Sequence, residues 1–117
     1  MVPSVIDARG EEVEIDLGDY LHGILDHPEM PSRVNWIAET LQNPEEIRRH
    51  WERHLRHREI YINTIYQSEE DIKGEMHIII VDRALGRLRF WTTFVPKDPE
   101  RYSKLVREGE LLWRAEN

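Results

Sequence analysis

The chain has 117 residues, no cysteine and a formal net charge of −7 at pH 7. That length is typical of one domain that can bury its own core, and the lack of cysteine excludes disulfides and thiolate metal sites. No apolar run approaches the roughly 20 residues needed to cross a membrane, and residues 1–10 lack the basic and apolar segments of a signal peptide, so we expect a cytoplasmic protein without a membrane partner.

Charge is unevenly distributed along the chain. Residues 7–29 are acidic apart from Arg9, whereas the segments 48–58 and 83–107 are rich in arginine and lysine. The overall balance argues mildly against nucleic-acid binding, because such domains usually show a basic footprint. The two basic segments can still form one basic face, although ordinary solvated charges explain them equally well. We expect a single domain, 1–117, with an acidic N-terminal arm (1–26) and a core (27–117).

The first predicted elements are a short strand and two helices. Val13, Ile15 and Leu17 alternate with acidic residues, which is the period of a half-buried strand. Residues 20–25 suit either a helical turn or a packed loop.

The first helix is predicted from the spacing of Val34, Ile37 and Leu41, with Ser32 or the prolines before it at its start. Asn43-Pro44 ends this helix and begins a second one. In the second helix the apolar residues recur every four positions, as Ile47, Trp51 and Leu55.

Three strands are predicted after the helices, over residues 60–66, 76–81 and 88–95. Alternation in the last strand places Leu88, Phe90, Thr92 and Phe94 on one face. Pro99 opens a short helix that ends at Gly109, and residues 111–113 either add a strand or simply pack down. This order predicts an α+β fold in which N-terminal helices pack on a mostly antiparallel meander sheet, followed by a short C-terminal helix.

Two stretches resemble a known group of proteins. Residues 27–47, HPEMPSRVNWIAETLQNPEEI, and the strand end Trp91-Thr92-Thr93-Phe94 resemble small phage and bacterial nuclease-like proteins of the barnase–EndoU–colicin E5/D–RelE superfamily. By element order the resemblance covers roughly residues 22–113, with close residue matches confined to those two stretches. It implies a metal-independent, toxin-like ribonuclease of phage-related origin that acts on RNA, needs no cofactor and is inhibited by a small antitoxin protein.

The resemblance also implies which side chains act. Histidine transfers protons near neutral pH, arginine holds phosphate through two parallel hydrogen bonds, and a hydroxyl can bind a phosphate oxygen. The candidate catalytic residues are His27, Arg33, Arg58, Tyr61 (or Tyr66) and Thr92. Where relatives often have Thr-Ala-Tyr, this chain has Thr92-Thr93-Phe94, so one hydroxyl is missing.

More ordinary roles compete with these. His27 can be a helix-entry residue whose ring bonds the local backbone, and Arg33 can be a surface charge that pairs with Glu29 or Glu39. Tyr61 and Tyr66 are five residues apart in a strand, so they point to opposite faces and at most one serves a site.

Other histidines form a second pattern. His50, His54 and His57 fall on one face of the predicted second helix, a spacing that can bind zinc. The arginines between them would repel a dication, so a metal site is disfavoured. The segment is then either an ordinary basic, partly titratable helix face or a phosphate-facing surface that strengthens as pH falls. His77 interrupts an apolar strand and is predicted to be a buried, hydrogen-bonded structural residue.

The main alternative to a nuclease is a non-enzymatic α+β interaction module that uses an exposed face to bind another protein or, as a homodimer, its own copy. The nuclease hypothesis requires the candidate residues to converge in one positively charged cleft. The interaction hypothesis requires a contiguous apolar patch on the surface.

Overall fold

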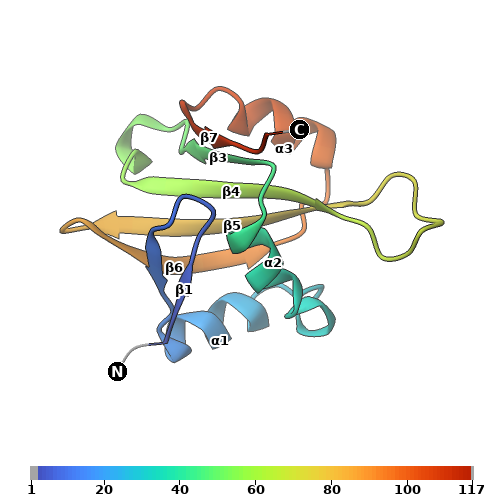
Figure 1. The fold of residues 1–117 in the computed structure, drawn as a ribbon, viewed down its shortest axis with the longest axis horizontal. Helices are drawn as coiled ribbons and strands as arrows, with labels where there is room; N and C mark the ends of the chain where they lie inside the picture. The colour runs from blue at the N-terminus through green and yellow to red at the C-terminus, as the bar shows by residue number, and fades with distance from the viewer. Residues whose placement is uncertain (1–2, 117) are drawn as a thin grey trace.

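The computed structural model describes residues 3–116 as a seven-stranded sheet with three α-helices packed against it (Figure 1). In chain order the elements are β1 (Ser4–Ile6), β2 (Glu12–Glu14), α1 (Leu17–Leu25), α2 (Trp36–Gln42), β3 (Glu46–Arg49), β4 (Arg58–Ile65), β5 (Glu75–Ala84), β6 (Arg87–Phe94), α3 (Pro99–Val106) and β7 (Leu111–Arg114). Two 3₁₀ turns lie in the connections, η1 (Pro31–Arg33) and η2 (Arg53–Leu55). No helix of the described residues is long and apolar enough to span a bilayer.

The strands are arranged in the order β1-β2-β6-β5-β4-β3-β7. At the centre, β4, β5 and β6 form the predicted antiparallel meander. β2 pairs with β6 in the parallel direction, through Val13 opposite Leu88. The α+β class is therefore confirmed, and the sheet is mixed because of this one parallel pair.

Two apolar clusters cover the two faces of the sheet. The cluster on the side of α1 and α2 buries Val13, Ile24, Met30, Ile37, Leu41, Ile47, Tyr61, Ile79, Val81, Leu88 and Phe90. The cluster on the side of α3 buries Ile60, Ile62, Ile78, Ile80 and Val106. We call these sides the α1–α2 face and the α3 face. β5 contributes to both clusters, as its nearly continuous apolar sequence predicts.

The acidic N-terminal segment is built into this sheet. β1 and β2 form an antiparallel hairpin at one edge, and Val13 at its centre is fully buried. The predicted strand over residues 13–17 is shorter than expected, because the side chain of Asp16 accepts the backbone N–H of Asp19 and caps α1. Residues 20–25, for which the sequence left a helical turn or a loop open, belong to α1.

The first predicted helix is confirmed in part. Pro31 begins η1, a position that suits its fixed φ angle, and the regular α-helix starts only at Trp36. Residues 111–113, left open between a strand and a packed segment, lie in β7.

The second predicted helix is wrong. Where the recurrence of Ile47, Trp51 and Leu55 suggested a helix, the chain forms β3 and then η2. Ile47 pairs with Tyr61 of β4 on one side and with Trp113 of β7 on the other, and it is fully buried. Strand pairing on both sides satisfies the backbone here, so tertiary context overrides the local helical pattern.

β6 contains a β-bulge at Trp91. Phe90 pairs with Val81 and Thr92 pairs with Ile80, which leaves Trp91 without a residue directly opposite it. An extra residue of this kind kinks the strand and redirects the side chains beyond it.

The bulge corrects the face assignment made from the sequence. Strict alternation placed Leu88, Phe90, Thr92 and Phe94 on one face. Leu88 and Phe90 do belong to the α1–α2 cluster, but Phe94 packs against the α3 cluster. The two ends of β6 therefore contribute apolar side chains to opposite faces of the sheet.

Candidate functional site

The bulge places Trp91 beside the first residue of β4. The Cζ atom of Arg58 lies 4.5 Å from the centroid of the Trp91 ring. Trp91 is 46% exposed, so a ligand can reach its indole. A guanidinium over an indole is a cation–π arrangement, and here it holds positive charge next to a flat apolar surface.

Arg58 also belongs to a row of charges across the three central strands. The register places Arg58 opposite Asp82, and Asp82 opposite Arg89. Residues directly opposite one another point to the same face of a sheet, and alternation from Ile60 shows that this is the α3 face. The start of β4 and the end of β5 lie at the left of Figure 1, away from α3 at the upper right.

His57 adjoins this row of charges. Its Nε2 atom lies 3.4 Å from Oδ1 of Asp82, with the imidazole about half exposed and the carboxylate mostly buried. The backbone N–H of Arg83 donates to the carbonyl of His57, which fixes the end of the η2 connection against β5. A carboxylate in this position can orient the ring and stabilise the charge that forms when the ring takes up a proton.

Nε of Arg58 and Oδ1 of Asp82 are both buried, and neither has a hydrogen-bond partner among the described residues. A buried unpaired polar atom costs about 1–3 kcal/mol, so it is seldom retained without a reason. We call His57, Arg58, Asp82, Arg89 and Trp91 the Arg58 cluster. It offers charge and an exposed ring to a ligand that has an anionic group and a flat base.

The structure brings only two of the five predicted residues into the same part of the sheet. Thr92 follows Trp91 on β6, so it lies in the region of Arg58. Its access is limited, because α1 packs against it so closely that a Cβ atom on Gly23 would lie 3.5 Å from Thr92 Cα.

Tyr61 lies on the opposite face from Arg58 and is fully buried. Its hydroxyl donates to Oδ2 of Asp7 at 2.5 Å and accepts from Nη2 of Arg9 at 3.1 Å. Burial and the hydrogen bond to Asp7 raise the pKa of Tyr61. In this arrangement Tyr61 holds the N-terminal arm in place and cannot contact the same phosphate as Arg58.

His27 and Arg33 lie apart from both Arg58 and Tyr61. The ring of His27, just after α1, packs on Phe94 with 5.4 Å between centroids. Nη1 of Arg33 donates to the backbone carbonyl of Glu29 at 2.7 Å, and Nη2 lies 3.4 Å from the carboxylate of Glu75. The five residues therefore do not meet in one cleft.

His77 is the buried structural histidine that the sequence predicted. Its Nδ1 lies 2.6 Å from Oγ1 of Thr40, and its Nε2 lies 2.7 Å from Oγ1 of Thr93. Thr93 donates its own proton to the carbonyl of Ile78, so it must accept from Nε2–H, and Nδ1 then accepts from Thr40. Burial lowers the pKa of His77 to about 4, which keeps the ring neutral at pH 7.

The three histidines of residues 50–57 do not share a helix face, because no α-helix forms there. His50 stacks on Trp51, and its Nδ1 accepts the backbone N–H of Glu52. His54 and His57 approach different carboxylates. Within residues 3–116, no group of three or more His, Cys, Asp or Glu side chains lies where it could hold a metal ion.

Sequence reasoning missed Asp82 and considered His57 only within the histidine pattern. A usable signal was present, since Arg58 precedes one apolar strand and Asp82 follows the next. Antiparallel pairing of neighbouring strands brings the start of one beside the end of the other.

A family model described as phage-Barnase-EndoU-ColicinE5/D-RelE like nuclease2 matches residues 3–114. Comparisons with curated proteins and with solved structures give no significant match. The family match includes residues 3–26 of the N-terminal arm, and it spans all three α-helices and all seven strands of the described structure. The chain therefore belongs to the phage-Barnase-EndoU-ColicinE5/D-RelE like nuclease2 family, which confirms the superfamily that residues 27–47 and 91–94 indicated.

Proposed function

We propose that this protein is a metal-independent endoribonuclease whose active site is the Arg58 cluster. The family match supports a nuclease in general. The observation that supports this particular site is the guanidinium of Arg58 over the exposed ring of Trp91, next to His57 and Asp82.

The proposed reaction is a transesterification within the RNA backbone. His57 removes the proton from a ribose 2′-hydroxyl, and that oxygen attacks the adjacent phosphorus. The bond from phosphorus to the 5′-oxygen then breaks, which leaves a 2′,3′-cyclic phosphate, and the departing oxygen takes a proton from solvent. An imidazole suits the first transfer because it exchanges protons near neutral pH.

The other members of the cluster bind and orient the substrate. Arg58 donates hydrogen bonds to the phosphate and neutralises the charge that builds up during the attack. Asp82 orients the ring of His57 and stabilises it once protonated. Trp91 gives a neighbouring base a surface on which to stack.

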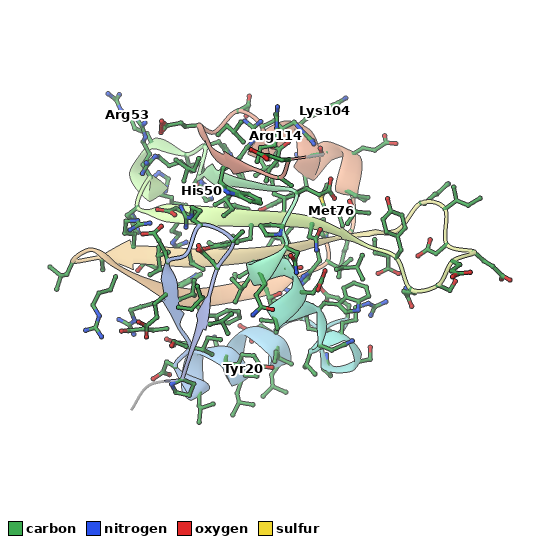
Figure 2. All side chains as sticks on the ribbon, viewed as in Figure 1. Tyr20, His50, Arg53, Met76, Lys104 and Arg114 are labelled. Carbon is green, nitrogen blue, oxygen red and sulfur yellow. The ribbon has the colours of Figure 1, made fainter. Side chains whose placement is uncertain are left out.

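The acidic net charge does not prevent this binding, because exposed arginines lie next to the cluster. Arg53 and Arg56 lie just before His57, and neither forms an ion pair within the described part of the chain. Figure 2 shows Arg53 extending away from the body of the molecule. These two guanidinium groups are suited to the phosphates that flank the cleaved bond.

The test is cleavage of a mixed-sequence single-stranded RNA in the presence of EDTA. His57→Ala and Arg58→Ala should each lower the rate by about 100-fold or more, the usual contribution of a proton-transfer group or a charge-stabilising group. His54→Ala is the matched control, since His54 is a nearby exposed histidine with its own carboxylate neighbour. Full activity in His57→Ala, or a loss in His27→Ala instead, would refute this site.

A second candidate function has one observation in its favour. Leu17, Leu21 and Leu25 of α1 are 63%, 56% and 73% exposed and form a stripe along one side of the helix. Such a stripe suits a non-enzymatic interaction module that binds another protein or a second copy of itself. A small antitoxin would also be a protein partner that could bind there. Molar mass from light scattering of wild type and Leu21→Glu tests self-association: a wild-type dimer that becomes a monomer in the variant would support it.

A further inference from the structure

A pocket of about 770 Å³ opens between the end of α1, the end of β6 and α3. Its size is within the usual range for small-molecule sites. The pocket is lined by, among others, His27, Glu29, Phe94, Lys97, Arg101 and Tyr102. None of them belongs to the Arg58 cluster.

The apolar part of the pocket is aromatic. His27 and Phe94 have ring centroids 5.4 Å apart with an interplanar angle of 33°, and Tyr102 meets Phe94 edge-on at 5.4 Å. Planar rings bind well against such walls, because stacked and edge-to-face arrangements are both favourable. A flat heteroaromatic ligand therefore fits better than an aliphatic one.

One side chain that lines the pocket, Tyr102, carries an unused hydrogen-bonding group. The hydroxyl of Tyr102 is buried and has no hydrogen-bond partner among residues 3–116. Burial raises the pKa of Tyr102, so the hydroxyl keeps its proton and can donate it. A ring nitrogen or carbonyl on the ligand would satisfy this donor, which otherwise carries the desolvation cost of an unpaired buried group.

The pocket carries charges of both signs, and its cations are the groups left without an ionic partner among the described residues. Each acidic side chain there is already engaged: Asp26 with His22, Glu29 with the backbone N–H of Val95, and Asp98 with the backbone N–H of Arg101. By contrast, the exposed cations Lys97 and Arg101 form no ion pair with any residue that the structure describes. Two free cations beside an aromatic pocket are suited to a phosphate attached to a planar base.

We propose that this pocket binds a nucleotide, with its base against His27, Phe94 and Tyr102 and its phosphate at Lys97 and Arg101. Trp91 and Phe94 are three residues apart on β6, which is about 10 Å along a strand. A nucleotide in the pocket would therefore be a near neighbour of one stacked on Trp91. The role of the pocket as a base-recognition subsite rests on the proposed ribonuclease function, whereas its ability to bind a free nucleotide does not.

The experiment is a titration of the wild-type protein with nucleoside 5′-monophosphates, followed by NMR chemical shifts. Nucleosides provide the base without the phosphate, and ribose 5-phosphate provides the phosphate without the base. We expect the monophosphates to bind several-fold more tightly than either part. Equal binding of ribose 5-phosphate, or no binding at millimolar concentration, would overturn the proposal.

Two variants test the assigned contacts. Tyr102→Phe removes only the unpaired hydroxyl, so it should weaken monophosphate and nucleoside binding several-fold while the melting temperature stays the same or rises. Lys97→Ala should weaken monophosphate binding but leave nucleoside binding unchanged. Lys104→Ala is its matched control, because Lys104 lies on α3 outside the pocket and points away from the body in Figure 2. Unchanged affinity in both Tyr102→Phe and Lys97→Ala would refute the assignment.

The outcome can be separated from that of the RNA-cleavage test. If monophosphates bind as described but RNA is not cut, the pocket inference stands and the ribonuclease proposal fails. If RNA is cut and monophosphates do not bind, the ribonuclease proposal stands and the pocket inference fails.

Discussion

Acidification should destabilise this protein through His77, a buried residue outside the Arg58 cluster. The ring is fully buried and is held between Thr40 and Thr93 as the neutral tautomer with its proton on Nε2. A second proton on Nδ1 would face the oxygen of Thr40, which would then need to accept instead of donate. The folded state therefore resists protonation, and burial lowers the pKa of His77 to about 4.

The sign and size of the effect follow from proton linkage. In the unfolded chain His77 titrates near its ordinary value of about 6.5. Between pH 6.5 and 4 the unfolded state binds more protons than the folded state, so the free energy of unfolding falls as pH falls. A difference of about 2.5 units corresponds to roughly 3 kcal/mol below pH 4, of which about 2 kcal/mol is already lost at pH 5.

Urea denaturation followed by tryptophan fluorescence at pH 7 and pH 5 measures this loss. His77→Gln does not titrate, and its amide can donate to Thr93 and accept from Thr40, so the loss between the two pH values should shrink by about 2 kcal/mol. His54→Gln, an exposed histidine, is the matched control and should keep the wild-type dependence. Equal losses in wild type and His77→Gln would refute the reasoning. His50, whose pKa is also lowered by burial, remains in all three proteins and does not affect the comparison.

Three further changes have expected outcomes. Gly109→Ala would place a Cβ atom 2.0 Å from the carbonyl oxygen of Arg49, so the melting temperature should fall by the equivalent of about 1–3 kcal/mol. Arg9→Met leaves the buried carboxylate of Glu59 without one of its two arginine partners, and urea denaturation should show a loss of about 2 kcal/mol; an unchanged midpoint would show that Arg83 alone suffices. Trp91→Ala should weaken RNA binding by about 1–3 kcal/mol without unfolding the protein, measured by fluorescence anisotropy with a labelled 2′-O-methyl oligonucleotide, which has no free 2′-hydroxyl and so cannot be cleaved by the proposed reaction. Wild-type affinity in the variant would exclude stacking on this ring.

The central strands could be predicted because their local amino-acid composition is enough to identify them as strands. Residues 76–81 are nearly all apolar and β-branched, and the strand they form is covered on both faces. His77 within them could also be placed correctly, since a polar ring in such a strand must find internal partners.

The region after Asn43 could not be predicted because its pattern is ambiguous. A four-residue recurrence of apolar side chains fits a helix, yet the buried position of Ile47 is set by β4 and β7, which contribute partners from elsewhere in the chain. The bulge at Trp91 is hidden for the same reason, because only the register against β5 reveals the extra residue.

In the candidate site, too, some residues could be predicted from the sequence and others could not. Arg58 could be singled out from the family resemblance, whereas its neighbours on the sheet depend on strand pairing. Tyr61 is on the same strand and near in sequence, but strand alternation turns it to the opposite, buried face.

The way in which the N-terminal arm is held has a consequence for how the protein folds. Val13 pairs with Leu88, and Asp7 accepts a hydrogen bond from Tyr61, so the arm has its partners in strands that are synthesised much later. Contacts between such distant parts of a chain form slowly, because a large loop must close before they are gained. We expect the meander of β4–β6 to form without the arm and the β1–β2 hairpin to dock last. During that interval the edge of β6 is unpaired, and an exposed strand edge of that kind can recruit another chain. Docking of the arm is then the step that protects a newly made molecule from aggregation.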